Sequence, residues 1–188
     1  MRVRLILPAL LAATALTLVG CGEEKSASSS GAAEKSSPTA SGSSAPAGDG
    51  TAAVPETLRF TGTTVDGKPF DAATLAGKPT VLWFWAPWCP TCKAQGPETA
   101  KVAARFQGQA HVIGVAGLDK PQAMKDFVTD TGVGAFPNLA DEAGGVWKKF
   151  EITQQSVYVI LDKDGKTVFT GSLPAGKGLA GKVSPLVG

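Results

Sequence analysis

The chain has 188 residues, of which 43% are hydrophobic and 18% are charged, and this balance suits one globular core of ordinary size plus additional segments. The formal charge is +2, but Arg2 and Arg4 lie in a segment that we expect to be removed, which lowers the Lys+Arg count from 18 to 16, equal to the 16 Asp+Glu. A neutral protein has no electrostatic footprint for nucleic acid, so nucleic-acid binding is excluded. Three cysteines and a single histidine are too few for a disulfide scaffold and supply a metal site poorly.

The first residues have the pattern of an export signal, which we predict to span residues 1–20. Arg2 and Arg4 precede an apolar run over residues 5–19 that is interrupted by one proline and two threonines. About 15 apolar residues are too few for a comfortable bilayer span but suit the apolar region of a signal peptide.

Cys21 ends a short motif, Leu18-Val19-Gly20-Cys21, that resembles the lipobox of bacterial lipoproteins. The resemblance implies cleavage before Cys21 and transfer of a diacylglycerol to its sulfur, so we expect an exported protein anchored to the outer face of the cell membrane. Several acyl chains, at ~0.8 kcal/mol per buried methylene, hold a domain on a membrane more firmly than one myristoyl chain does. The alternative is ordinary secretion after cleavage nearby, with Cys21 as an incidental free thiol.

Beyond Cys21 the composition changes abruptly up to residue 54. In this 21–54 segment Ser, Ala, Gly and Pro dominate, charges are sparse and aromatic residues are absent. Such a segment cannot bury enough apolar surface to offset the entropy lost on ordering, so we predict a disordered linker. About 33 flexible residues have a root-mean-square span of roughly 30 Å. The linker would let the predicted folded domain, residues 55–188, swing over the membrane surface.

The folded part is predicted to begin with a β-hairpin. Two extended segments, 58–61 and 63–65, precede Asp66-Gly67, a dipeptide that favours a hairpin turn. A short helical turn over residues 71–76 follows.

The remaining elements alternate between apolar strands and amphipathic helices. Thr80 to Ala86 is apolar on both faces, as expected of a central strand that is covered on both sides. Pro97 is expected to kink the helix that follows, and Asp119 to cap the next one. The predicted elements are a strand at 80–86, a helix at 90–106, a strand at 110–116, a helix at 120–131, a strand at 137–139, a helix at 142–150, strands at 156–161 and 166–171, and a helix at 178–186. This order predicts an α/β fold with a mixed sheet flanked by helices.

The motif Trp88-Cys89-Pro90-Thr91-Cys92 lies where the central strand ends and a helix begins. A helix start offers unpaired N–H groups and a partial positive charge, which stabilise a thiolate at Cys89 and lower its pKa. The thiolate is the attacking species in disulfide exchange. Cys92 lies one helical turn later on the same face, and we expect it to be the more buried thiol, which resolves the mixed disulfide formed by Cys89. This cycle moves two electrons and needs no cofactor.

Other roles for the two cysteines fit less well. A structural zinc site needs four ligands, and in a monomer two cysteines and the distant His111, for which we expect a structural role, do not supply them. A structural disulfide across so small a loop gains little entropy. Chance does not explain a pair placed at a strand–helix junction of an exported chain. A peroxiredoxin needs a threonine three residues before its reactive cysteine, where this chain has Ala86 before Cys89.

The cysteine pair belongs to a longer motif over residues 77–93, GKPTVLWFWAPWCPTCK. This motif resembles the TlpA/ResA/DsbE-like envelope branch of the thioredoxin superfamily and, within it, the secreted DsbE-like proteins of actinobacteria. The likeness covers roughly residues 58–188. It implies a thioredoxin-like fold with an N-terminal hairpin, catalytic roles for Cys89 and Cys92, exported protein thiols and disulfides as substrates, and a membrane redox partner that recycles the pair.

Gln155-Ser156 departs from the pattern of the superfamily, which has a cis-proline facing the two cysteines at the position of Ser156. A cis bond costs ~2.5–4 kcal/mol before a non-proline residue and ~0.5–1 kcal/mol before proline. The bond before Ser156 is therefore strained or relaxed to trans, unless Ser156 holds the same geometry at small cost. The family uses this backbone to bind an extended substrate segment, so the substitution predicts weaker or altered substrate docking.

Two further departures remove acids. Trp83 stands where thioredoxins place a buried Asp, and Gln95 stands where many members of the branch place a Glu. In the family both acids help to move the proton of the resolving thiol. We therefore predict slow resolution of mixed disulfides, unless Glu98, Lys93 or water serves instead.

We expect Trp88, Pro90 and Thr91 to contact the substrate beside Gln155 and Ser156, and the protein to act as a monomer. Formation of disulfides in exported proteins is slightly favoured over the alternative, reduction of thiols for cytochrome c maturation. The three departures together suggest an alternative of another class, a tethered substrate-binding module with weak turnover.

Overall fold

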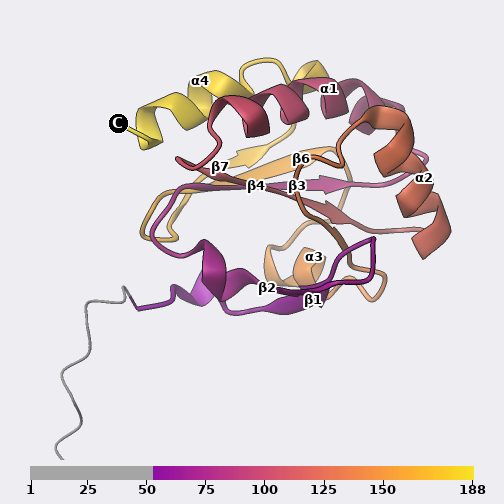
Figure 1. Ribbon diagram of the computed structural model, residues 1–188, viewed down its shortest axis with the longest axis horizontal. Helices are drawn as coiled ribbons and strands as arrows, with labels where there is room; N and C mark the ends of the chain where they lie inside the picture. The colour runs from indigo at the N-terminus through magenta and orange to yellow at the C-terminus, as the bar shows by residue number, and fades with distance from the viewer. Residues whose placement is uncertain (1–52) are drawn as a thin grey trace, which may run out of the picture. The chain divides into compact units, whose positions relative to one another are not determined.

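The computed structural model describes residues 53–188, and Figure 1 shows their arrangement. The predicted signal peptide, lipidated Cys21 and nearly all of the predicted linker lie outside these residues. The described elements are η1 (Glu56–Leu58), β1 (Thr61–Thr63), β2 (Pro69–Asp71), η2 (Ala72–Leu75), β3 (Thr80–Trp85), α1 (Pro90–Arg105), β4 (His111–Ala116), α2 (Pro121–Thr131), β5 (Asn138–Ala140), α3 (Gly145–Lys149), β6 (Val157–Leu161), β7 (Thr167–Gly171), η3 (Pro174–Gly176), α4 (Leu179–Val183) and η4 (Ser184–Leu186). No helix within this range has the length and apolar content of a membrane span.

A mixed five-stranded sheet, in the order β5-β4-β3-β6-β7, forms the centre of the fold. β3 pairs in parallel with β4 and antiparallel with β6, and all six of its residues are buried. The central position predicted for this strand is therefore confirmed. Trp85 lies opposite Ala116 and Phe84 lies opposite Val157, so the end of β3, the end of β4 and the start of β6 meet at one edge of the sheet.

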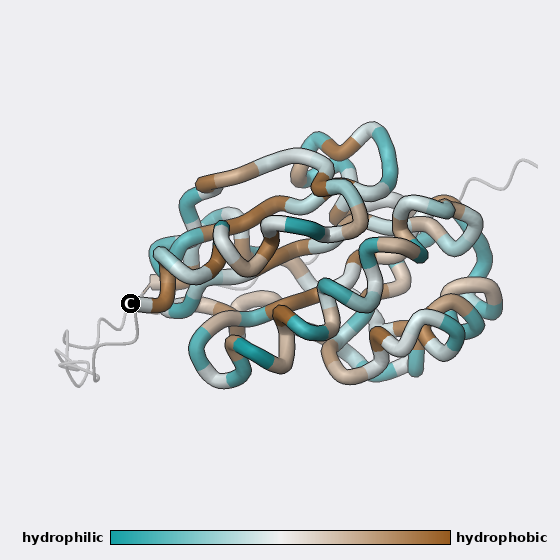
Figure 2. The backbone as a smooth tube through the Cα atoms, turned by 90° about the horizontal axis from the view of Figure 1, so that it is seen from above, coloured by the Kyte–Doolittle hydropathy of each residue, from teal (hydrophilic) through white to brown (hydrophobic). Residues whose placement is uncertain are grey.

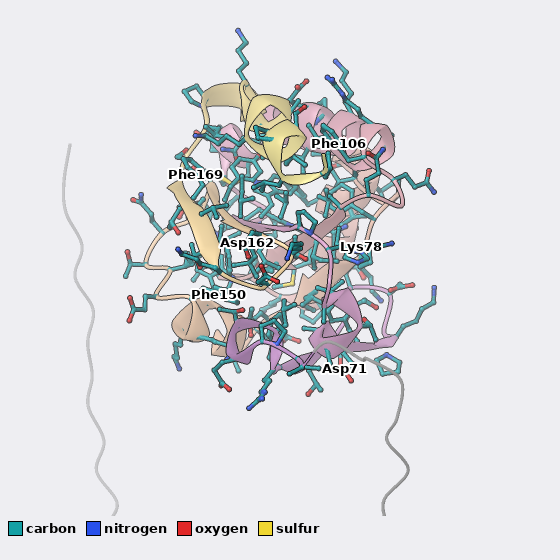
Figure 3. All side chains as sticks on the ribbon, turned by 90° about the vertical axis from the view of Figure 1, so that its left-hand side faces the viewer. Asp71, Lys78, Phe106, Phe150, Asp162 and Phe169 are labelled. Carbon is teal, nitrogen blue, oxygen red and sulfur yellow. A yellow bond between two sulfur atoms is a disulfide. The ribbon has the colours of Figure 1, made fainter. Side chains whose placement is uncertain are left out.

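Apolar residues cover both faces of the sheet. Alternate β3 side chains point to opposite faces: Trp83 and Trp85 pack in the cluster that includes α1, α2 and α4 residues, while Leu82 and Phe84 pack with η1, η2 and α3 residues. Figure 1 shows α1 and α4 on one side of the strands and α3 with the β1–β2 hairpin on the other. Figure 3 shows the same division, with Phe106 above the strands and Phe150 below them.

The hydropathy of the backbone follows this layering. In Figure 2 brown hydrophobic residues alternate with teal hydrophilic residues along the coiled segments of the chain. This alternation is expected of helices with one buried face. The predicted fold class, a thioredoxin-like mixed sheet flanked by helices with an N-terminal hairpin, matches this arrangement.

The N-terminal hairpin differs in detail from the prediction. Leu58 belongs to the turn η1, where its N–H donates to the carbonyl of Pro55 at 2.9 Å, and it is not part of a strand. The strands pair as 61–63 with 69–71 around the predicted Asp66-Gly67 turn, in which Gly67 has φ 85°. Gly67 supplies this positive φ at no steric cost.

Several helix ends also differ from the prediction. Asp119 does not cap α2: its carboxylate accepts only from the N–H of Lys120, and the helix begins at Pro121 after Lys120 as N-cap. α3 begins at Gly145 because the carboxylate of Asp141 accepts from the N–H groups of Gly145 and Trp147. α1 continues from Pro90 through Pro97 as one helix.

Candidate active site

Cys89 and Cys92 lie at the start of α1 and form a disulfide, with their Cα atoms 5.2 Å apart. Cys89 is the N-cap residue, with extended backbone angles (φ −81°, ψ 113°), and Pro90 takes the first helical position. The N–H of Cys92 donates to Sγ of Cys89 at 3.0 Å. Both side chains are buried, with 2% exposure for Cys89 and none for Cys92. A sulfur that accepts a hydrogen bond from a helix N-terminus is in the environment that stabilises a thiolate once the disulfide opens.

Gln95 forms a buried polar bridge behind the disulfide. Its Oε1 accepts from the indole N–H of Trp83 at 2.8 Å, and its Nε2 donates to the carbonyls of Ser156 at 3.1 Å and Leu173 at 3.0 Å. The Gln95 side chain has no exposed surface. Its one acceptor and two donor hydrogens match one donor and two acceptors, a set that an ionised carboxylate cannot satisfy.

A second buried amide, that of Asn138, makes the same kind of contacts with Trp85, two residues after Trp83 on β3. The indole N–H of Trp85 donates to Oδ1 of Asn138 at 3.2 Å, and Nδ2 of Asn138 donates to the carbonyls of Val133 and Phe136, both at 2.9 Å. Gly114 makes room for this contact, because a Cβ there would collide with the Asn138 amide and lie 2.7 Å from the Trp85 indole nitrogen. The two amides thus tie loops on both sides of the site to the central strand.

Ser156 lies at the start of β6 with a left-handed backbone, φ 62°. Its carbonyl accepts from Gln95 and its hydroxyl lies 3.4 Å from the hydroxyl of Ser172. Proline fixes φ near −65° and cannot take this conformation. Ser156 therefore has a backbone conformation that the proline of the superfamily cannot adopt, and the hydrogen bond from Gln95 holds the carbonyl of Ser156 in place.

The other predicted substrate-contact residues gather at the same edge of the sheet. Trp88 is 53% exposed, and Pro90 and Thr91 are exposed beside it at the start of α1. Gln155, half-buried, precedes Ser156 in the loop that enters β6. The register of β3 with β6 brings this loop to the end of β3 where the disulfide lies.

His111 lies at the opposite edge, where it pairs with Thr80 at the start of β3. Burial, and to a lesser extent the positive charge of Lys78, lower the pKa of its imidazole. Within residues 53–188 no cluster of three or more His, Cys, Asp or Glu could hold a metal ion.

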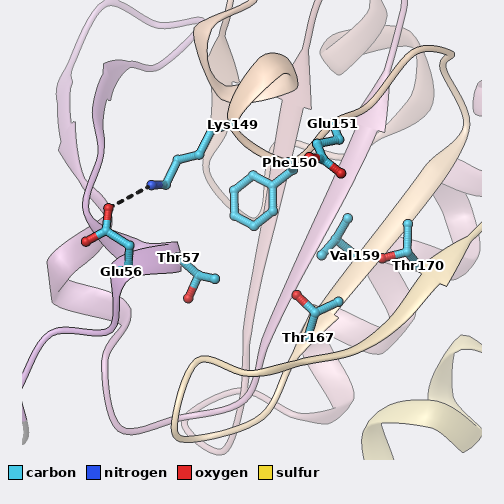
Figure 4. A pocket seen from close by; sticks show the side chains of 8 residues that line it. All are labelled: Glu56, Thr57, Lys149, Phe150, Glu151, Val159, Thr167 and Thr170. Carbon is cyan, nitrogen blue, oxygen red and sulfur yellow. Dashed lines mark ion pairs between the residues drawn. The ribbon is translucent and has the colours of Figure 1, made fainter.

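A hollow of about 390 Å³ lies away from the disulfide, between η1, α3 and the β6–β7 ladder. Figure 4 shows its lining, which includes the ion pair between Lys149 and Glu56 at 3.6 Å. Its remaining lining residues are mostly threonines and Phe150. It contains no cysteine and none of the predicted site residues.

Leu118 and Asn138 belong to the site but were not predicted from the sequence. The carbonyl of Leu118 accepts from the indole N–H of Trp88 at 3.3 Å, and Asn138 anchors Trp85. An amide that follows a proline in a short strand, Pro137-Asn138, carries no local signal for burial. Leu118 follows Gly117 directly after a predicted strand, and this position at a strand end is the sequence feature that could have pointed to it.

The comparisons with known proteins agree with this geometry. A family model described as the AhpC/TSA family matches residues 53–169. The chain belongs to the AhpC/TSA family. One relative of this AhpC/TSA protein is the soluble secreted antigen MPT53 of Mycobacterium tuberculosis strain H37Rv, which is 39% identical over 71% of this chain and 78% of its own length. Another is the thiol–disulfide oxidoreductase ResA of Bacillus thuringiensis, 26% identical over 60% of this chain and 65% of its own.

Solved structures give the same result for this AhpC/TSA protein. The structure of MTB dsbF has a TM-score of 0.66 and 42% identity and is covered over 98% of its length by 71% of this chain. A secreted Mycobacterium tuberculosis disulfide oxidoreductase homologous to E. coli DsbE has a TM-score of 0.64 and 38% identity, over 70% of this chain and 98% of its own. The protein is a thiol–disulfide oxidoreductase of the DsbE/ResA type, so the predicted enzyme class and family resemblance are confirmed.

Proposed function

We propose that this protein introduces disulfides into exported proteins, with Cys89 as the sulfur that forms the mixed disulfide with the client and Cys92 as the sulfur that it displaces. In the reverse direction Cys89 is the nucleophile and Cys92 the resolving thiol. The observation that carries the proposal is the hydrogen bond from the N–H of Cys92 to Sγ of Cys89 at the N-terminus of α1. A group that stabilises the Cys89 thiolate stabilises the reduced pair, and stabilising the reduced form makes a disulfide a stronger oxidant.

The surroundings of the pair support this direction. The two positions where the family places acids hold Trp83 and Gln95, whose side chains do not ionise, and both are buried. A carboxylate in either place would repel a thiolate and favour the disulfide form. With a neutral indole and a neutral amide there, the helix N-terminus acts on Cys89 without that opposition.

The reaction is a two-step exchange. A client thiolate attacks Sγ of Cys89, the Cys89–Cys92 bond breaks, and Cys92 leaves as a thiolate that takes up a proton. A second client thiolate then attacks the client sulfur of the mixed disulfide, and Cys89 leaves. The client dithiol loses two electrons and two protons as its disulfide forms. The pair gains the two electrons, Cys92 takes up one proton, the other is released to water because Cys89 leaves as a thiolate, and no cofactor is needed. Because neither Trp83 nor Gln95 can exchange a proton with Cys92, the step in which Cys92 gains or loses its proton is slow in both directions.

The substrate platform is the edge formed by Trp88, Pro90, Thr91 and the Gln155-Ser156 loop. The carbonyl of Ser156 is occupied by Gln95, which leaves the neighbouring backbone of Gln155 as the place where an extended client segment adds. This supports altered rather than lost docking.

The location proposed for this chemistry is the outer face of the cell membrane. Support comes from the predicted signal peptide at residues 1–20, the lipobox-like motif that ends at Cys21, and relatives that are described as secreted. The protein acts there as a monomer tethered through the predicted linker, and a membrane redox partner reoxidises the pair. Mass spectrometry of the mature N-terminus tests the tether, and an unmodified Cys21 would exclude it.

Paired assays on one preparation test the direction. The oxidised protein is mixed with a reduced, unfolded disulfide protein, and the reduced protein is mixed with insulin, with Cys89→Ser and Cys92→Ser as controls. We expect faster oxidative refolding than insulin reduction, and a reduction potential nearer to roughly −120 mV than to roughly −270 mV. The opposite ratio supports the reductase alternative, and activity in neither assay supports a binding module.

A further inference from the structure

Leu118 combines two unusual features. It has a left-handed backbone, φ 62°, and its side chain is 54% exposed. A bulky non-glycine residue with positive φ is an outlier, because Cβ crowds the following carbonyl. Strain of this kind, when it holds an apolar side chain out in solvent, points to a functional contact.

Leu118 lies at the same edge of the sheet as the disulfide. It follows Ala116, the last residue of β4, and the N–H of Gly117 donates to the carbonyl of Trp85 at 3.0 Å. The indole N–H of Trp88, the neighbour of Cys89, donates to the carbonyl of Leu118. Only three large apolar side chains are exposed among residues 53–188, and two of them, Trp88 and Leu118, are joined here.

A hollow of about 310 Å³ opens beside Leu118, and we call it the Leu118 hollow. The indole of Trp147 forms part of its lining, packed so closely on Gly117 that a Cβ there would lie 2.7 Å from the ring. Ile152 adds a half-buried apolar side chain and begins the loop that leads to Gln155-Ser156. The volume is at the lower end of the ~300–1,000 Å³ of ligand pockets, which suits one side chain.

The polar residues around the Leu118 hollow do not favour a charged occupant. The carboxylate of Asp141 already accepts from two N–H groups of α3. The remaining charges are Glu142 and Lys148, both exposed and of opposite sign. By contrast, a separate hollow that Trp88 itself lines also has Asp119, Asp126 and Asp130 with Lys93 around it, and would suit a basic side chain.

We propose that the Leu118 hollow is a specificity subsite that takes a nonpolar side chain of the client polypeptide next to its cysteine. The inference rests on the proposed function, since a client sulfur that reaches Cys89 must bring its flanking residues over Trp88 and Leu118. The binding is noncovalent and adds no step to the exchange. It makes the enzyme prefer cysteines that lie in apolar segments, which are the ones buried when the client folds.

The test compares three dithiol peptides of one sequence that differ by Leu, Ser or Lys beside the first cysteine. The full-length oxidised protein is mixed with each, and the second-order rate constant of peptide oxidation is measured for the wild type and for Leu118→Asn. Asparagine tolerates the left-handed backbone, so the variant removes the apolar side chain without adding strain. Val168→Ser is the matched control, because Val168 is the third exposed apolar side chain, 47% exposed, and lies on β7.

We expect the wild type and Val168→Ser to oxidise the leucine peptide about tenfold faster than the serine peptide, the discrimination that a hydrophobic pocket gives for a small apolar difference. In Leu118→Asn the ratio of the leucine-peptide rate to the serine-peptide rate falls to about two or less. In the separate variant Leu118→Met, which keeps an apolar side chain, the ratio stays as in the wild type. Equal rates for the leucine and serine peptides in the wild type overturn the subsite while leaving the oxidase intact. A preference for a lysine peptide, which would place the client in the acidic hollow, also overturns it. If none of the three peptides is oxidised, the result counts against the proposed function itself.

Discussion

Replacing Gln95 by Glu tests the polar bridge behind the disulfide. The Gln95 amide accepts from Trp83 and donates to two carbonyls, those of Ser156 and Leu173, in a fully buried site. A protonated carboxyl can donate to only one of the two carbonyls, and a buried carbonyl without a donor costs about 1–3 kcal/mol. An ionised carboxylate donates to neither and faces both oxygens. The folded-state pKa of this carboxyl is therefore raised above its unfolded value of about 4.3.

The sign of the pH dependence follows from that raised pKa. Below about pH 4.3 the carboxyl is protonated in both states, and Gln95→Glu lowers the free energy of unfolding by about 1–3 kcal/mol. As pH rises above 4.3 only the unfolded state loses the proton. The difference in the free energy of unfolding between wild type and variant therefore grows by about 1.4 kcal/mol per pH unit, until the pH reaches the pKa of the carboxyl in the folded state. The loss is a large part of a typical stability of about 5–15 kcal/mol.

Urea unfolding of the wild type and the variant at intervals from pH 4 to pH 8 measures this difference. Asn138→Asp should behave in the same way, because Asn138 makes the corresponding contacts to Trp85 and two carbonyls. Gln109→Glu, at an exposed position, should follow the wild type. A Gln95→Glu curve that runs parallel to the wild type over the whole pH range would refute the reasoning.

Three further outcomes are expected. Ser156→Pro should unfold more easily and lose peptide turnover, whereas Ser156→Gly should keep the fold, because only glycine of the two accepts φ 62°; an active, stable proline variant would contradict this in a turnover and melting assay. Gly114→Ala should lower the free energy of unfolding by about 2–4 kcal/mol, because its Cβ would collide with Asn138, overpack the core and break a buried hydrogen bond. Gly181→Ala in α4, whose Cβ would meet open space, should leave the free energy of unfolding unchanged or raise it in the same urea titration. His111→Gln should make stability less sensitive to acid: the folded pKa of His111 is lowered, so the wild type loses stability as pH falls below about 6.5, and equal acid sensitivity of both proteins would be the contrary result.

The central part of the fold could be predicted from local patterns. The apolar run at β3, the two strand segments on either side of Asp162 to Gly165, and the strand–helix junction at Cys89 each carry a short-range signal. The structure has the central strand, the β6–β7 pair and the junction, although β6 is buried at all five positions. The helix ends were less predictable, because Asp141 and Asp119 are both plausible caps and only the folded chain shows which N–H groups reach each carboxylate.

The site around the disulfide was predicted only in part. The sequence identified Gln95 as a missing acid, but its partners Ser156 and Leu173 lie 61 and 78 residues away in the chain, and no local pattern links them. The left-handed backbones of Ser156 and Leu118 are imposed by such long-range contacts, and neither residue type favours that conformation. Local propensity therefore located the reactive pair, while tertiary packing decided what surrounds it.

The pH dependence of Cys89 alkylation tests the central claim most directly. The reduced protein is treated with iodoacetamide at a series of pH values, and modification of Cys89 is followed by mass spectrometry with Cys92→Ser as a second preparation. A thiolate stabilised by the N-terminus of α1 predicts a midpoint well below the value of about 8.5 for free cysteine. A midpoint at about 8.5, with the rate of free cysteine in water, would contradict the assignment of Cys89 as the activated nucleophile.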